Sequence, residues 1–181
     1  MLAASDSKLV SAALAGKARA WDKLVKRYDG LVYNYALRMV SNPDDARDIM
    51  QDTFMAVCRN LAGWRGESQF KSWLMTIAHH RCVEFYRRRR EQQGLDDSEE
   101  PRSDCDWHQP EQVYSQQQQG RRLVAALQQI PLAQRQVLEM KFFQQLTLTD
   151  IAQRTGTSLN TVKSRLYSGA DKLKQLLEGE S

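Results

Sequence analysis

The segment most suited to chemistry alternates aromatic and cationic side chains over residues 70–90 (FKSWLMTIAHHRCVEFYRRRR). Trp73, His80 and Tyr86 could stack on unpaired bases, as in proteins that bind single-stranded nucleic acid. Lys71 and the arginines could pair with the phosphates. Four arginines in a row could equally be the solvated end of a helix. The apolar stripe and the polar loop that precede them favour a nucleic-acid interface.

A second candidate interface lies in residues 148–166 (LTDIAQRTGTSLNTVKSRL). The pattern predicts a short helix, a turn at Gly156, where glycine permits a left-handed backbone, and a second helix with Val162 and Leu166 on its buried face. A helix-turn-helix has this layout and places its second helix in the major groove of DNA. The alternative is an ordinary helical hairpin with a solvated outer face. The residues off the predicted core face are Asn160, Thr161, Lys163, Ser164, Arg165, Tyr167 and Ser168.

A third pattern is an acidic stripe at helical spacing. Asp44, Asp48 and Asp52 follow one another at i, i+4 and i+8, so they share one face of a helix. Asp44 and Asp45 would also favour the helix N-terminus electrostatically. Spacing alone leaves two interpretations open: a solvated face, or a docking face for a basic partner.

No arrangement of residues indicates catalysis, a metal site or a cofactor. His79 and its neighbour would point about 100° apart on a helix, which suits chelation poorly. Cys105 and His108 have ligand spacing but stand alone in an acidic segment. Cys58, Cys82 and Cys105 form no CxxC pair, so we expect reduced thiols in a cytoplasmic protein. We expect neither enzyme activity nor a bound metal.

The elements that must position these residues are helices. The chain has 20 Leu and 17 Ala against 4 Ile and 10 Val, a balance that favours helix over strand. Residues 95–118 carry one cation and seven acids and lack an apolar period, which is typical of a linker. We therefore expect an all-α protein: two small helical domains, 1–94 and 119–181, joined by an acidic flexible linker, 95–118, with the helix-turn-helix in the second domain. No apolar run approaches the ~18 residues of a membrane span, so we expect no membrane insertion.

Helix boundaries follow from caps and breakers. Asn42-Pro43 reads as a helix start, and Thr147 and Ser158 read as N-caps. The glutamines at 116–119 could begin a helix or extend the linker. The expected helices are Ser7–Ala15, Lys17–Tyr28, Leu31–Val40, Pro43 to about Leu61, Gln69–Arg90, Gly120–Gln129, Pro131–Phe143, Thr147–Thr155 and Leu159–Leu177.

Together these segments resemble the extracytoplasmic-function (ECF) class of bacterial sigma factors. Residues 44–57 are similar to that family's core-polymerase-binding helix, residues 64–90 to its promoter-melting segment, and residues 130–166 to its C-terminal helix-turn-helix domain. The resemblance implies a cytoplasmic transcription initiation factor without a cofactor. Its implied partners are core RNA polymerase, promoter DNA and an anti-sigma factor.

The resemblance also assigns residues. For core polymerase it implies Asp44, Asp48, Gln51, Asp52 and Phe54. For the −10 element it implies Arg65, Ser68, Lys71, Trp73, His80, Arg81, Arg87 and Arg88, and for the −35 element the seven outer residues of the second helix given above. Two positions depart from the family pattern. His80 stands where many relatives carry Asn, and Ser168-Gly169 stands where they often carry Arg-Ala, which implies a different or weaker reading of the −35 element.

Three other readings compete with a sigma factor. The first is a conventional regulator resembling the LuxR-type helix-turn-helix domain, which would have no need of the aromatic and arginine segment at 64–90. The second is a sigma-like decoy that binds polymerase without directing transcription. The third is a nucleic-acid-modifying enzyme that uses His79, His80 or Glu84.

Overall fold

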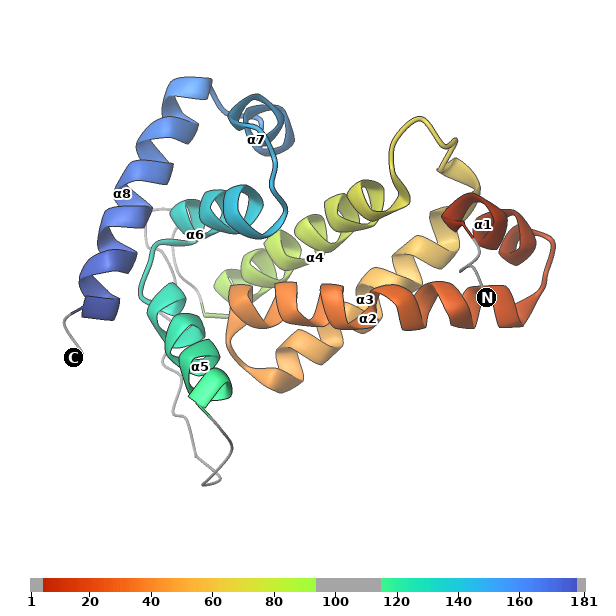
Figure 1. Ribbon diagram of the computed structural model, residues 1–181, viewed down its shortest axis with the longest axis horizontal. Helices are drawn as coiled ribbons and strands as arrows, with labels where there is room; N and C mark the ends of the chain where they lie inside the picture. The colour runs from red at the N-terminus through yellow and green to blue at the C-terminus, as the bar shows by residue number, and fades with distance from the viewer. Residues whose placement is uncertain (1–4, 94–114, 179–181) are drawn as a thin grey trace. The chain divides into compact units, whose positions relative to one another are not determined.

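The structure is a computed structural model that describes residues 5–93 and 115–178, and all regular elements in these ranges are helices (Figure 1). The chain divides into two compact units. One comprises Met1–Ala36 and Pro43–Arg89, and the other comprises Leu37–Asn42 and Arg90–Ser181. The predicted all-helical class is confirmed. Most of the predicted linker lies outside the described residues, and the glutamines at 116–119 belong to a helix.

The N-terminal unit is built from four α-helices and a short 3-10 helix. They are α1 (Asp6–Leu14), α2 (Ala18–Val40), α3 (Pro43–Asn60), the 3-10 helix η1 (Leu61–Gly63) and α4 (Phe70–Gln93). The last residues of α2, from Leu37, and of α4, from Arg90, group with the other unit. Helix α3 begins at Pro43, as predicted from the Asn42-Pro43 signal. Residues 64–69 separate η1 from α4; the polar loop expected before the aromatic and arginine segment thus begins after Gly63, which belongs to η1, and α4 begins at Phe70, one residue later than the predicted Gln69.

Helix α2 corrects the prediction of two helices at 17–28 and 31–40. It is one continuous helix, and Gly30 sits within it without a left-handed backbone. A glycine in a helix interior costs about 1 kcal/mol relative to alanine. Leu24 and Val32 are both fully buried, on either side of Gly30. Their burial extends the helix through the glycine, because each buried aliphatic side chain contributes roughly 1.5–3 kcal/mol.

Ring contacts join the helices of the N-terminal unit. Tyr28 of α2 lies 5.5 Å from Phe70 of α4 between ring centroids. The hydroxyl of Tyr35 lies 3.3 Å from Nδ1 of His79, and both residues are buried. Helix α4 therefore contacts α2 at two places along α4, one at its first residue, Phe70, and one near its middle, at His79.

Helix α1 is fastened to α2 through one carboxylate. Arg27 donates to Oδ1 of Asp6 at 2.5 Å, and the Tyr28 hydroxyl donates to Oδ2 at 2.6 Å. Burial, and next the hydrogen bond to Asp6, raise the pKa of Tyr28 to about 12. The phenol therefore remains a donor well above its ordinary titration range.

The C-terminal unit contains α5 (Ser115–Gln128), α6 (Leu132–Leu138), a π-helical turn η2 (Glu139–Phe143), α7 (Leu148–Thr155) and α8 (Leu159–Glu178). Helix α8 packs against α5, α6 and α7 (Figure 1). The predicted helix at 131–143 thus changes to π geometry at Glu139. Arg135 fixes the turn between α5 and α6 by donating to the carbonyls of Gln128 and Ile130, each at 3.0 Å.

The predicted stop and start signals of the C-terminal unit are confirmed. Thr147 and Asp150 form a capping box at α7, with the Asp150 amide donating to the Thr147 hydroxyl at 3.1 Å. Gly156 ends α7 in the left-handed region, with φ of 64°. The Ser158 hydroxyl accepts from the Thr161 amide at 3.1 Å and so caps α8. These local signals set the angle of the turn between α7 and α8.

Gly169 has a packing role that the sequence did not indicate. It is buried in α8, and a Cβ placed on it would lie 3.2 Å from Gln134 Cβ and 3.2 Å from Leu138 Cδ1. These contacts are tighter than ordinary side-chain packing. The glycine therefore lets α8 approach α6 closely, which explains one departure from the family pattern without any reference to DNA.

Candidate nucleic-acid and partner interfaces

Helix α3 presents its acidic residues outward. Asp44, Asp48, Gln51 and Asp52 are exposed, while Ile49 and the other buried residues of this helix face the core. Asp44 pairs with Arg47 at 2.8 Å, and because both side chains are exposed to solvent this ion pair contributes little to stability. The outer face of α3 is thus a dense negative surface on a rigid helix.

Asp45 lies at the edge of this acidic face. Partial burial raises its pKa, and the like charges of Asp48 and Asp44 act in the same direction. Arg89 of α4 acts in the opposite direction, because its positive charge stabilises the carboxylate. The end of α4 therefore contributes positive charge beside the start of α3.

Phe54 differs from the other residues predicted to bind polymerase. It is 8% exposed and meets Trp21 edge-on, with 6.4 Å between ring centroids. Its position on the apolar side of α3 explains the difference, since neighbouring Thr53 and Val57 are buried too. In this structure Phe54 supports α3 from within and does not belong to the acidic face.

A hydrogen bond from a tryptophan side chain holds together the loop at 64–69, which precedes α4. Trp64 donates from Nε1 to the carbonyl of Ser68 at 3.1 Å, and Gly66 turns the loop with φ of 77°. Buried Phe70 lies 5.6 Å from Trp64 and 5.7 Å from Trp73, measured between ring centroids. Both tryptophans are half-buried, so each retains accessible ring surface beside the loop.

Two of the cations and the hydroxyl predicted to bind the −10 element lie around this tryptophan pair. Arg65 and Ser68 are exposed in the loop, and Lys71 is exposed in the first turn of α4. Accessible indole surface next to exposed cations is an arrangement on which bases stack and phosphates pair. The structure thus brings Arg65, Ser68, Lys71 and Trp73 to one end of α4.

The aromatic residues further along α4 separate into core and surface. His80 is exposed, as a contact residue must be. Tyr86 is only 5% exposed, so the expectation that it stacks on bases is wrong. His79 is buried against Tyr35. Tyr86 lies on the same buried side of α4 as Cys82, which precedes it by one helical turn. Because arginines follow Tyr86 directly in the sequence, the residue pattern did not indicate that it is buried.

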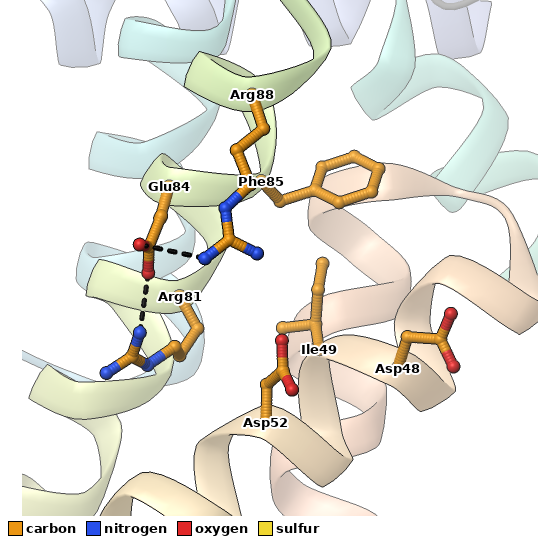
Figure 2. Close-up of a pocket in the computed structure, with 7 residues that line it drawn as sticks. All are labelled: Asp48, Ile49, Asp52, Arg81, Glu84, Phe85 and Arg88. Atoms are coloured by element: carbon orange, nitrogen blue, oxygen red, sulfur yellow. Dashed lines mark hydrogen bonds and ion pairs between the residues drawn. The ribbon is translucent and has the colours of Figure 1, made fainter.

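The predicted arginines of α4 surround one acid. Arg81 donates to Oε2 of Glu84 at 2.5 Å and Arg88 donates to Oε1 at 3.0 Å (Figure 2). Nη2 of Arg87 lies 3.9 Å from the same Oε1. Sequence reasoning did not include Glu84 among the DNA-binding residues. Its spacing of three residues from Arg81 and four from Arg88 is the signal that could have found this cluster.

Helix α8 presents the predicted DNA-reading residues. Val162 is fully buried with Val137, Met140 and Ile151, and Leu166 packs against the same cluster. The other side of the helix carries exposed Asn160, Lys163, Ser164, Tyr167 and Ser168, with Arg165 and Thr161 half-buried. The Thr161 hydroxyl lies 2.8 Å from that of Ser158, so it also takes part in the cap.

The described residues hold no group of three or more His, Cys, Asp or Glu side chains placed to bind a metal ion. The thiol of Cys58 is exposed and that of Cys82 is buried. Cys105 and His108 lie outside the described residues. Within residues 5–93 and 115–178 no helix combines the length and apolar character of a membrane span.

Comparison with known proteins covers both units. Sigma-70 region 2 matches residues 24–92, and Sigma-70 region 4 matches residues 120–173. RNA polymerase sigma factor YlaC of Bacillus subtilis is 32% identical over 155 residues, 85% of this chain and 90% of the relative. ECF RNA polymerase sigma factor SigK of Mycolicibacterium vanbaalenii is 30% identical over 152 residues, 81% of this chain and 76% of the relative.

Solved structures share the fold. Sigma factor RpoE of Bartonella quintana, in a co-crystal with the anti-sigma factor NepR, matches with a TM-score of 0.70 and 23% identity over 87% of this chain and 96% of that one. CnrH, in complex with the cytosolic domain of CnrY, matches with a TM-score of 0.65 and 24% identity over 97% and 99%. A LuxR-like regulator is not favoured, because the relatives match along both units. The chain belongs to the ECF class of bacterial RNA polymerase sigma factors.

Proposed function

We propose that this chain binds core RNA polymerase through α3, captures the −10 element with the start of α4 and reads the −35 element with α8. Residues 1–94 would form the domain for polymerase and the −10 element, and residues 119–181 the domain for the −35 element, with 95–118 as the linker. A transcription initiation factor needs these surfaces on one chain, because promoter contacts act only when the polymerase is held as well.

One feature carries this proposal: the continuous acidic outer face of α3. Asp44, Asp48 and Asp52 are exposed on one helix whose opposite face is packed into the core. Charges on a rigid, exposed helix steer a partner of opposite sign at little conformational cost. The partner is therefore a basic surface, and in a sigma factor that surface belongs to core polymerase.

The two DNA contacts differ in kind. At the start of α4, half-buried Trp64 and Trp73 offer ring surface on which a base out of the duplex can stack, and Arg65 and Lys71 supply charge for phosphates. On α8, exposed Lys163 and neighbouring polar side chains suit a duplex major groove. The first contact therefore requires melted DNA, whereas the second requires paired DNA.

Regulation is proposed to come from an anti-sigma protein that covers these surfaces. The RpoE and CnrH structures, which share the fold, were solved in complex with NepR and with the cytosolic domain of CnrY. Both units of this chain expose charged and aromatic side chains, Tyr167 of α8 being 71% exposed, that such a protein would cover. Because core polymerase works in the cytoplasm, we place the chain there as well.

A titration of the labelled full chain with bacterial core polymerase tests the proposal. Asp48→Lys should weaken binding about tenfold, since it places a like charge against a basic partner surface. Asp22→Lys is the matched control, because Asp22 is exposed on α2 and the substitution changes the charge equally. Equal affinities for both variants would remove α3 from the interface. Binding to duplex DNA without any binding to core polymerase would favour the LuxR-like regulator.

A further inference from the structure

We propose that Glu84 restrains the binding of α4 to DNA phosphates by occupying the guanidinium groups of Arg81 and Arg88. This inference rests on the proposed function, in which both arginines contact melted DNA near the −10 element. Glu84 would act as an internal substitute for a phosphate: an anion already present where the DNA backbone has to bind.

The geometry of the cluster supports this role. Each oxygen of the Glu84 carboxylate takes a different arginine, Oε2 from Arg81 at 2.5 Å and Oε1 from Arg88 at 3.0 Å. Figure 2 shows Glu84 between the two guanidinium groups along one side of α4. A carboxylate that bridges arginines one turn before and one turn after it occupies donors that would otherwise point at a ligand anion.

Glu84 is held in its charged form. Partial burial favours the neutral acid, but the charges of Arg81 and Arg88 and their hydrogen bonds outweigh it and lower the pKa of Glu84 below its ordinary value. Glu84 therefore remains an anion throughout the neutral range, and it competes with phosphates under all ordinary conditions.

The arginines are accessible to a phosphate. The side chain of Arg88 is 58% exposed and that of Arg81 is 31% exposed, against 28% for Glu84. A pair this exposed contributes little to folding stability, because solvent screens it. The cluster is thus better explained by control of where the guanidinium charge is directed than by stabilisation of α4.

The space beside the cluster allows the arginines to move. A cavity of about 190 Å³ lies between residues of α4 and α3, and Glu84, Arg81 and Arg88 line one side of it. Asp48 and Asp52 line the other side (Figure 2). Because those carboxylates have the same sign as Glu84, they keep the cavity unfavourable for phosphate. DNA phosphates therefore have to approach Arg81 and Arg88 from the side of α4 that faces away from the cavity, where they compete with Glu84 for the guanidinium groups.

Glu84→Gln removes the competing charge and preserves the shape of the side chain. We would measure binding of a labelled single-stranded DNA oligonucleotide by fluorescence anisotropy, with the full chain alone and with the chain bound to core polymerase. The variant should bind about threefold to tenfold more tightly. Between about 50 and about 200 mM salt, the slope of log K against log salt should steepen by about 0.7, the contribution of one more neutralised phosphate on a single strand.

Two comparisons isolate the arginines from overall charge. Asp22→Asn removes one negative charge from an exposed position on α2 and should leave the slope unchanged. In an Arg88→Gln background, Glu84→Gln should lose at least half of its effect on a logarithmic scale, because the two side chains act as a coupled pair. Far-UV circular dichroism checks that each variant is folded, and Glu84→Ala replaces Glu84→Gln if the latter is not.

The outcomes separate this inference from the proposed function. If the wild-type chain binds DNA neither alone nor with core polymerase, the proposed function fails and the inference fails with it. If the wild type binds but Glu84→Gln leaves affinity and salt slope unchanged, the inference alone is overturned. Weaker binding by Glu84→Gln would also overturn it, because Glu84 would then be orienting the arginines toward DNA.

Discussion

Substitution of Gly169 by alanine tests the close packing of α8 on α6. Alanine improves helix propensity by about 1 kcal/mol over glycine, so on an open helix surface the change stabilises. At this position the new Cβ would stand 3.2 Å from Gln134 Cβ and 3.2 Å from Leu138 Cδ1. We expect Gly169→Ala to destabilise the C-terminal unit despite the gain in propensity.

The magnitude follows from what surrounds the new methyl group. Leu138 is 1% exposed and packs with Leu127 and Ile130, so it has little room to withdraw. Inserting a methyl group into a packed site typically costs about 1–3 kcal/mol. After the propensity gain the net loss is about 1 kcal/mol, which lowers Tm by about 4–8 °C for a unit of this size.

Gly120→Ala is the matched control in the same unit. Gly120 lies in α5, is exposed, and has nothing within 4 Å of the position of an added Cβ. This variant should be stabilised by up to about 1 kcal/mol. Urea unfolding followed by circular dichroism gives the free energy of unfolding of each variant, and hydrogen exchange across α8 assigns the change to the C-terminal unit.

The two substitutions should therefore have opposite signs. If Gly169→Ala stabilises the protein as much as Gly120→Ala does, Leu138 yields to the methyl group at no cost. Close approach would then not be the reason for glycine at this position. Gly169→Leu is a second test of close packing. Leucine is a good helix former, but its larger side chain should destabilise the C-terminal unit by more than alanine does.

Three further predictions concern local contacts. Thr147→Ala removes the N-cap of α7 and should cost about 1 kcal/mol, measured as faster hydrogen exchange in α7. Burial and the hydrogen bond to Asp6 raise the pKa of Tyr28 from 10.0 to about 12, so its stabilising contribution is complete below pH 10.0 and is lost as pH rises through about 12; unfolding of Tyr28→Phe should lack this pH dependence. Lys163→Ala should weaken duplex binding and reduce the salt slope by about 0.9, whereas Lys172→Ala, a control elsewhere on α8, should change neither.

Local signals in the sequence predicted much of the fold correctly. Pro43 at the start of α3, the Thr147 cap and the left-handed Gly156 each depend on a few neighbouring residues, and each was confirmed. The continuity of α2 through Gly30 was not predicted. It depends on residues of other helices packing against its core face, and that contribution exceeds a local propensity of about 1 kcal/mol.

Which aromatic side chains are buried and which are exposed was harder to predict from the sequence than the helix boundaries. Trp73 retains accessible surface as predicted, but Phe54 and Tyr86 are buried. An aromatic side chain suits a hydrophobic core and a base-stacking surface equally well, so residue type does not distinguish them. Only the direction of the side chain on its helix does, and in α4 the buried surface is wide enough to blur a single apolar stripe.

The close approach at Gly169 had no signal in the sequence either. Its cause lies in Gln134 and Leu138, more than thirty residues earlier in the chain. The resemblance to sigma factors drew attention to the position, but it suggested a change in DNA reading. The contacts in α6 indicate a constraint on packing instead, and the comparison of Gly169→Ala with Gly120→Ala tests that constraint.

The helices that carry the predicted interfaces also carry the core, and this determines how variants should be designed. In α3, buried Ile49 lies next to exposed Asp48, and in α8, buried Val162 lies next to exposed Lys163. A substitution at Asp48 or Lys163 changes charge where solvent already screens it, so it should alter binding without altering folding. A substitution one residue away creates a cavity and would abolish binding by unfolding the helix. Loss of binding therefore identifies a contact residue only when the free energy of unfolding is measured on the same variant.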